Sequence, residues 1–185
     1  VLALGDNGLA GPAGEIERIA TWLILEKGLH TYVKLNPTLL GYDFARSMLD
    51  SLGFGSVSFG DFHFKDDLQY ADALPMLRRL RALAEGKGLL FGVKLTNTLP
   101  VNVKNEELPA KEMYMSGRAL FPLSVSLAAR LASDFGGKLP ISYSGGADAY
   151  NIARLAQAGV FPVTAATTLL KPGGYGRLSQ LADLA

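Results

Sequence analysis

Cysteine is absent from the 185 residues, and histidine occurs only twice. The missing thiols exclude disulfides, Cys-ligated zinc and Cys-ligated iron–sulfur clusters from this chain. His30 and His63 have no second histidine or carboxylate at ligand spacing on one helix, so no metal site is predicted. The lack of cysteine also favours a cytoplasmic location over an oxidising compartment.

Long apolar runs and a strong charge of one sign are missing as well. No stretch is long enough to cross a membrane, and no basic region precedes an apolar segment at the start. Lys and Arg number 18 against 17 Asp and Glu, and the one basic cluster, residues 78–81, lies within a helical pattern. We therefore expect neither a membrane nor a nucleic acid as partner. Hydrophobic residues make up 49% of the chain, which indicates a folded domain with a core.

Short apolar segments alternate with longer amphipathic ones along the chain. Strands are predicted over residues 31–35, 56–59, 89–95, 139–143 and 160–165, and residues 97–112 are predicted to be mostly loop. Helices are predicted over residues 15–26, 43–52, 74–85, 119–135 and 148–158, the last capped by Asp148, with a terminal helix after residue 176. The Gly-rich opening, residues 5–14, lacks the preceding strand and the spacing of a dinucleotide-binding loop.

About five βα units indicate an α/β fold with a parallel sheet. A (β/α) TIM-type barrel and an open doubly wound sheet both fit this alternation. A complete barrel takes about 250 residues, so residues 1–185 are expected to form a single barrel domain or fragment. It would be the C-terminal part of a barrel whose first strands precede Val1, a start without Met.

Two glycines separate a predicted strand from a predicted helix at Ser144-Gly145-Gly146. Glycine lets the backbone approach a ligand closely, and the N–H groups at the start of a helix suit a phosphate. The alternative is a plain turn with glycine for tightness. The next strand ends in Ala166-Thr167-Thr168. The loops after the last two strands of a barrel often share one phosphate site, so we expect these two segments to meet.

Lys34 and Lys94 each lie in an apolar strand, where a lysine is unfavourable unless it is paired or functional. Near a barrel mouth their ammonium groups could stabilise a reduced flavin, or they could simply reach water along their stems. Asn36 and Asn97 follow these lysines and offer donors and acceptors to a planar ring, or else form turns. Catalytic roles are predicted for Lys34, Lys94 and Asn97.

Two further segments are weaker candidates. Ser116 and Gly117 precede a helix and provide a second anion contact in the predicted site. Residues 61–67 bring three aspartates and His63 together, either at the active-site mouth, with His63 as acid or base, or as a solvated loop.

The chain resembles the FMN-binding barrels of the dihydroorotate and dihydropyrimidine dehydrogenase superfamily. Within it, the likeness is greatest to the flavoproteins named as selenate reductase subunits. The resembling stretches are residues 15–19, 26–31, 33–42, 66–70, 112–118, 142–151 and 166–177.

The resemblance implies an FMN cofactor in the complete barrel. It implies that Lys34, with Asn36 beside it, lies next to the flavin ring and Ser116-Gly117 near the flavin tail. It also implies that Gly145, Gly146, Ala166 and Thr167 bind the phosphate. Ser144 and Thr168, next to them in the chain, are predicted to bind the cofactor as well. Iron–sulfur clusters and NAD(P)H or FAD would belong to other domains of a longer protein.

Three functions are compatible with these features. The first is an FMN-dependent oxidoreductase domain that transfers electrons between the flavin and a small substrate or partner redox domains. The second is a non-catalytic barrel that serves as a scaffold or docking domain of a larger flavoprotein. The third is a phosphate-binding lyase or isomerase, with Lys34 or Lys94 as a Schiff-base nucleophile.

Overall fold

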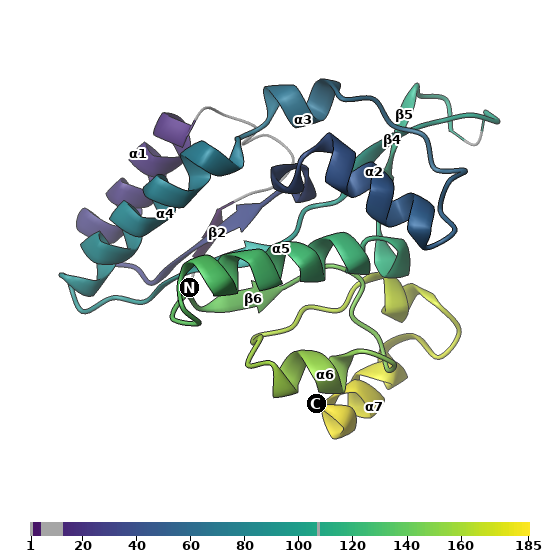
Figure 1. The fold of residues 1–185 in the computed structure, drawn as a ribbon. Helices are drawn as coiled ribbons and strands as arrows, with labels where there is room; N and C mark the ends of the chain where they lie inside the picture. The colour runs from purple at the N-terminus through teal and green to yellow at the C-terminus, as the bar shows by residue number, and fades with distance from the viewer. Residues whose placement is uncertain (1, 5–12, 107) are drawn as a thin grey trace.

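The computed structural model describes residues 2–4, 13–106 and 108–185, and its centre is a four-stranded parallel sheet (Figure 1). The strands are β1 (Leu2–Leu4), β2 (Thr31–Leu35), β3 (Phe91–Leu95) and β6 (Ile141–Tyr143). They lie in the order β1-β2-β3-β6, so each strand joins the edge left by the previous one. A doubly wound sheet reverses direction at a switch point. This sheet does not reverse, which is the arrangement of a barrel wall.

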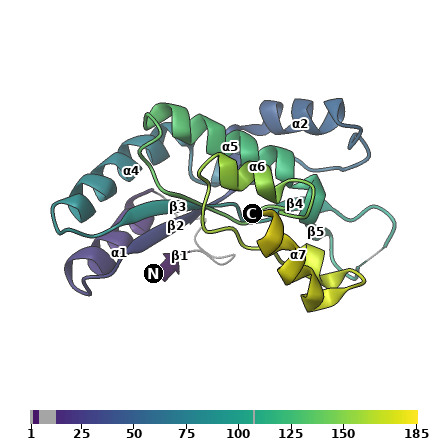
Figure 2. The same ribbon diagram turned by 90° about the horizontal axis from the view of Figure 1, so that it is seen from below.

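Helices connect the strands and cover one side of the sheet. In Figures 1 and 2, α1 and α4 lie side by side, and α5 follows along the same wall. The helices are α1 (Ala13–Leu25), α2 (Tyr42–Ser51), α3 (Phe62–Asp66), α4 (Tyr70–Glu85), α5 (Phe121–Asp134), α6 (Ile152–Gln157) and α7 (Arg177–Leu184). Short 3₁₀ turns lie at η1 (Pro37–Leu40), η2 (Gly117–Ala119), η3 (Thr167–Leu170) and η4 (Gly174–Gly176).

The two faces of the sheet differ in polarity. Alternate strand residues, among them Val33, Val93 and Ile141, are buried in the core with the apolar faces of the helices. The residues between them form a polar row across three strands, because Lys34 is paired with Lys94 and Lys94 with Ser142. A sheet covered by helices on both faces would be apolar on both. The polar row therefore belongs to the inner face of a barrel wall.

Residues 56–59 do not form the strand that the sequence predicts. The chain turns there, since the Val57 N–H donates to the Phe54 carbonyl at 3.0 Å. Phe59 is buried against the rings of Tyr42 and Phe64, at centroid distances of 5.6 and 5.7 Å. Aromatic packing, and not strand pairing, accounts for the apolar character of this segment.

The last predicted strand is also shorter than expected. Residues 160–165 join the sheet through a single bridge, in which Val163 pairs with Tyr143 in parallel. The bridge extends the sheet beyond β6. The strand order therefore continues in the single direction expected of a barrel. The bridge also brings Thr164 to the end of the polar row, where its hydroxyl accepts a hydrogen bond from Lys94 Nζ at 3.0 Å.

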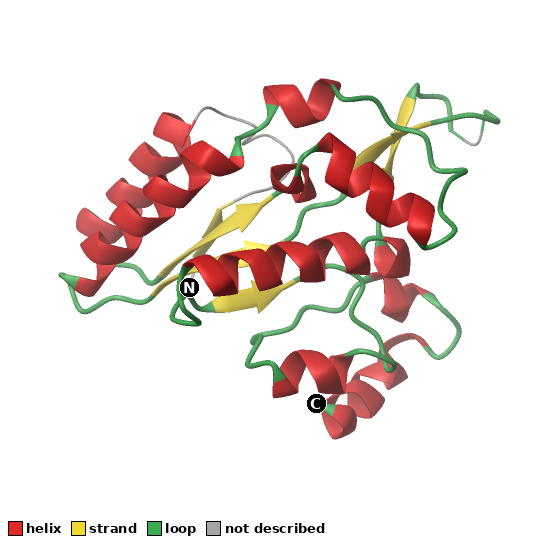
Figure 3. Cartoon of the chain, viewed as in Figure 1, coloured by secondary structure: helices red, strands yellow, loops and turns green. Residues whose placement is uncertain are grey.

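The segment predicted as loop contains a hairpin. β4 (Leu99–Asn102) and β5 (Glu112–Met115) pair antiparallel and stand apart from the main sheet (Figure 3). Leu99, Val101 and Met115 are buried, whereas the loop between the strands is polar. A long connection separates the two strands, so their pairing could not be recognised from a short stretch of the sequence.

Other predicted elements agree with the structure, with two corrections. β1 directly precedes the Gly-rich opening, where the sequence predicted no strand. The predicted helices and strands at residues 15–26, 31–35, 43–52, 74–85, 89–95, 119–135 and 139–143, and the terminal helix, are confirmed within a few residues. Asp148 is not the cap of α6, because that helix begins at Ile152 after Asn151. Most of the Gly-rich opening, residues 5–12, lies outside the described residues. Among the described helices, none has the length and apolar character needed to cross a membrane.

Candidate functional site

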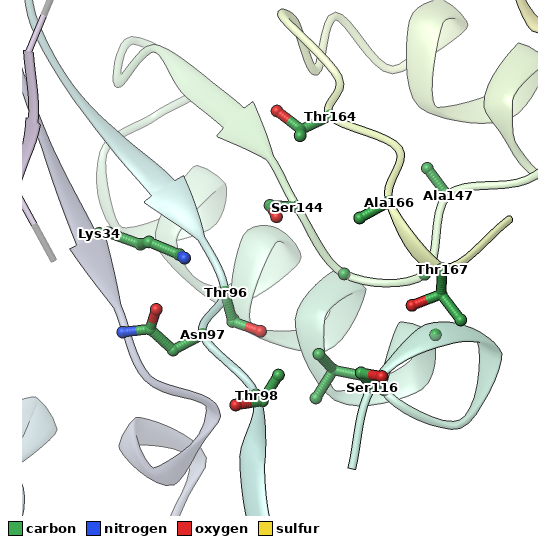
Figure 4. A pocket seen from close by; sticks show the side chains of 14 residues that line it. Lys34, Thr96, Asn97, Thr98, Ser116, Ser144, Ala147, Thr164, Ala166 and Thr167 are labelled. Atoms are coloured by element: carbon green, nitrogen blue, oxygen red, sulfur yellow. The ribbon is translucent and has the colours of Figure 1, made fainter. Parts of the chain in front are cut away.

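A cavity of about 240 Å³ opens at the carboxyl ends of β2, β3 and β6. This is the end at which barrel enzymes bind their ligands. The lining comes from five segments far apart in the chain, namely Lys34, residues 96–98, residues 116–120, residues 144–147 and residues 164–167. Figure 4 shows Lys34 and Asn97 on one side of it and Ala147, Ala166 and Thr167 on the other.

Backbone groups form the wall around the glycine pair. Gly145, Gly146 and Ala147 line the cavity and their N–H groups donate to no described residue, and the same holds for Ala166 and Thr167. Successive free N–H groups in a turn attract an anion because each carries a partial positive charge. The lining includes no Asp or Glu among the described residues. The wall is therefore suited to a phosphate or another oxyanion.

Close packing between turns explains the glycines of this wall. A Cβ on Gly146, whose φ is +78°, would lie 2.0 Å from the Gly117 carbonyl oxygen. A Cβ on Gly145 would lie 2.2 Å from Ser124 Oγ. Gly117 in turn packs on Thr167, whose Cγ2 would be 2.9 Å from an added Cβ. The three turns touch through Gly146 and Gly117, and this contact creates the wall.

Lys34 provides the charge of the opposite wall. It is half-buried, and its ammonium has no hydrogen bond or ion pair with any described residue. Lys94 lies beside it on β3 but is turned toward Thr164 and does not line the cavity. Burial, and to a smaller extent the charge of Lys34, holds the pKa of Lys94 below its ordinary value.

Asn97 is held next to Lys34 by a chain of side-chain hydrogen bonds. Asn97 Nδ2 donates to Asn36 Oδ1 at 2.7 Å, and Asn36 Nδ2 donates to Asp67 Oδ2 at 3.0 Å. Thr38 Oγ1 donates to the same Asp67 oxygen at 2.6 Å. Asp67 follows α3 and is one of the acidic cluster noted in the sequence. The sequence indicated no partner for it because Asn36 is 31 positions away.

Most of the predicted site residues meet at the cavity. Those that line it are Lys34, Asn97, Ser116, Gly117, Ser144, Gly145, Gly146, Ala166 and Thr167. Three others lie just outside it: Lys94; Asn36, which is engaged with Asp67 and Asn97; and Thr168, which is buried. Thr168 is turned away because successive side chains in a 3₁₀ turn point about 120° apart.

The sequence did not indicate several residues of the site. Thr96 and Ser124 share a buried hydrogen bond of 2.7 Å below the glycine wall, and Leu120 lines the cavity. A hydroxyl inside a helix, such as that of Ser124, gives no local signal of a partner 28 positions away.

The remaining acidic cluster does not reach the cavity. His63 Nε2 lies 2.8 Å from Glu112 Oε1, which ties α3 to the β4–β5 hairpin, and Asp61 pairs with Lys65. In the described part of the chain, no group of three or more His, Asp or Glu side chains could hold a metal ion.

Comparison with known proteins decides the family. A family model described as "Oxidoreductase YgfK, N-terminal TIM-barrel domain" matches residues 9–185. The chain belongs to this family. It is 56% identical over 168 residues to the oxidoreductase named YgfK of Escherichia coli K12, and equally to that of E. coli O157:H7. These matches cover 91% of the chain but 16% of the relatives, so the chain spans about a sixth of their length.

Membership of the YgfK family confirms the predicted TIM-barrel class and the oxidoreductase family. The narrower resemblance to selenate reductase subunits stays a prediction. Among solved structures, a crystal structure of DHODH from Eimeria tenella with ferulenol aligns at 17% identity and a TM-score of 0.45. It covers 93% of this chain and 53% of that one. At these values the likeness carries no argument about the site.

Proposed function

We propose that this YgfK-family domain binds FMN in the cavity at the strand ends and takes part in oxidation and reduction. The observation that carries the proposal is the set of unpartnered backbone N–H groups around a cavity lined by one lysine and no carboxylate. A phosphate ester would satisfy those groups.

The residues of the cavity fit the two ends of such a cofactor. The turns at Gly145-Gly146 and Ala166-Thr167 would hold the phosphate, with Ser116-Gly117 beside the chain that links it to the ring. Lys34 and Asn97 would contact the ring. The volume of about 240 Å³ lies below the roughly 300–1,000 Å³ of sites that enclose a whole ligand, so the described walls would surround part of it.

The flavin, when bound, supplies the redox chemistry. The chain supplies binding and electrostatics, because the half-buried ammonium of Lys34 stabilises negative charge nearby more strongly than an exposed lysine would. Asn97 adds a polar group of defined orientation next to it. The glycine wall binds the phosphate without contributing to the reaction itself.

Other parts of a longer protein would complete the reaction. The relatives in E. coli are named as oxidoreductases and are much longer than this chain. We propose that their remaining domains exchange electrons with the flavin, through iron–sulfur clusters and NAD(P)H or FAD. A small substrate, a cytoplasmic location and the absence of membrane and nucleic-acid partners are parts of the same proposal.

The proposal is tested by comparing FMN with riboflavin in the full-length protein. Riboflavin lacks the phosphate, so we expect it to bind at least about tenfold more weakly, measured by flavin fluorescence. Ser144→Asp should weaken FMN binding by roughly 10- to 100-fold, because a carboxylate would face the phosphate. The isosteric control Ser144→Asn should bind FMN nearly as the unchanged protein does.

Equal affinities for FMN and riboflavin would remove the phosphate assignment, and a protein that binds neither would favour the scaffold function. Substitution of Gly146 would be a poorer test. A Cβ there would collide with Gly117 and disturb the wall whether or not a phosphate binds it.

One observation favours the lyase or isomerase alternative. The lowered pKa of Lys94 makes a neutral amine, and hence a Schiff base, more accessible. Lys94 itself does not line the cavity, however, because its ammonium donates to Thr164 at the edge of the lining, which favours the flavin proposal. Borohydride reduction in the presence of a carbonyl phosphate distinguishes the two, since the alternative predicts a covalent adduct at Lys94.

A further inference from the structure

The hydrogen-bond chain from Asp67 to Asn97 has a fixed direction. A carboxylate at neutral pH only accepts hydrogen bonds. Asp67 therefore requires the NH₂ group of Asn36 to face it, and the NH₂ group does so at 3.0 Å. Asn36 must then direct its oxygen to the other side, where it accepts from Asn97 Nδ2 at 2.7 Å.

The same logic sets the group that Asn97 presents to the cavity. With its NH₂ donated to Asn36, Asn97 has its Oδ1 left over, and no described residue donates to that oxygen. Figure 4 shows the oxygen turned toward the side of Lys34. The wall thus presents an acceptor beside a donor, since the Lys34 ammonium is also unpaired among the described residues.

We propose that Asp67 is a positioning residue, which acts through Asn36 to hold Asn97 with its oxygen toward the cavity. A ligand edge that carries an N–H next to a carbonyl oxygen matches this pair, because the N–H donates to Asn97 and the carbonyl accepts from Lys34. The inference rests on the proposed function in that it concerns the ring end of the same cavity.

A free asparagine would not select such an edge. Asparagine offers a donor and an acceptor of similar size, so an unconstrained Asn97 could flip to suit either kind of ligand. Asp67 removes that choice although it does not line the cavity. The selected imide-type edge could belong to the flavin ring itself or to a small reactant, and the two sources require separate probes.

The first experiment uses the full-length protein with FMN and with 3-methyl-FMN, which lacks the ring N–H. The second uses succinimide and N-methylsuccinimide, detected by NMR of the Asn97 side-chain amide, and needs no bound flavin. In at least one pair we expect the N–H compound to bind about 3- to 10-fold more tightly, the effect of one hydrogen bond. Preference in the first pair assigns the edge to the flavin, and preference in the second to a reactant.

Asp67→Ala should bring that ratio close to one, while riboflavin and FMN still differ as they do in the unchanged protein. Asp67→Asn retains an oxygen at the position and should give an intermediate ratio, which also covers the case in which the alanine variant fails to fold. Asp66→Ala is the matched control, because Asp66 is an exposed neighbour outside the hydrogen-bond chain.

The inference is overturned if neither pair shows a preference, or if Asp67→Ala and Asp67→Asn both keep the full ratio. These results would leave FMN binding intact. Failure of the flavin proposal has a different signature, namely no FMN binding in the unchanged protein, and the succinimide pair still decides the role of Asp67 in that case.

Discussion

The two walls of the cavity are built from different parts of the chain. The wall at Gly145 and Gly146 consists of backbone, and its glycines are needed because neighbouring turns touch them. The wall at Lys34 and Asn97 consists of side chains, and Asn97 is held there by Asn36 and Asp67. The first wall should tolerate exchanges between neutral polar side chains, such as Ser144→Asn, but not an added Cβ on its glycines. The second should tolerate changes of shape but not of charge or hydrogen-bonding direction.

The strongest test of this contrast is Gly146→Ala. The added Cβ would lie 2.0 Å from the Gly117 carbonyl oxygen at a φ of +78°. We expect a loss of roughly 2–4 kcal/mol in the stability of the domain, because the backbone of both turns must move. Hydrogen exchange at the amides of β2 and β3 in the full-length protein measures that loss.

Gly159→Ala is its control, since Gly159 has a similar φ of +72° with no atom within 4 Å of the added Cβ. Only backbone strain remains there, at about 1 kcal/mol. Equal losses in the two variants would show that contact between the turns does not explain the glycine wall.

A smaller effect is expected from Thr96→Val below the same wall. The substitution keeps the shape but removes the 2.7 Å hydrogen bond to the buried Ser124 hydroxyl, which keeps the Tyr143 hydroxyl as a partner. This should reduce stability by about 1–3 kcal/mol in the same exchange measurement. Adding Ser124→Ala should restore part of it, because the hydroxyl that lost its Thr96 partner is then absent. A double variant less stable than Thr96→Val would contradict this account.

On the side-chain wall, Lys34→Met should change electrostatics more than stability. In the FMN-loaded protein the midpoint potential should fall by roughly 20–40 mV, equivalent to about 1–2 kcal/mol, because a cation near the reduced flavin is lost. Spectroelectrochemical titration measures the shift. Lys138→Met, at the opposite end of β6, should leave the potential unchanged, and an equal shift in both variants would exclude a local effect of Lys34.

The same variant should raise the pKa of Lys94 toward its ordinary value, measured by NMR titration of its side chain. The recovery should be incomplete, since burial is the larger cause of the lowered pKa. With a lowered pKa, Lys94 in the folded protein binds its proton less tightly than in the unfolded chain. Lys94 therefore lowers the free energy of unfolding at low pH. This destabilisation disappears as the pH rises through the pKa values of Lys94 in the folded and the unfolded chain. Removing Lys34 should weaken that pH dependence.

The sequence predicted the elements with strong periodicity and the glycine motif at the strand end. Helices such as α4 and α5 are recognisable because their apolar residues recur every three to four positions. The meeting of residues 144–147 with 166–167 followed from the general geometry of barrels. These features depend on local patterns or on a rule shared by all members of the fold.

The missed features depend on contacts between distant residues. Gly146 is needed because of Gly117, and Asn97 is oriented by Asp67 through Asn36. No local pattern encodes such pairs, since each residue alone is compatible with an ordinary turn. The absent strand at residues 56–59 has the same origin, because Phe59 is buried by rings from Tyr42 and Phe64.

The single bridge at Val163 gives a bound phosphate a mechanical role. Residues 160–185 join the sheet over a short stretch, through the pair of Val163 with Tyr143 and the Phe161 N–H, which donates to the Ile141 carbonyl. The turn at Ala166-Thr167 also forms part of the glycine wall. An anion held there would fasten the C-terminal segment to β6 and to the start of α5 at once. Saturation with the ligand should therefore slow proteolytic cleavage around α7 well before it affects α1, on the opposite flank of the domain.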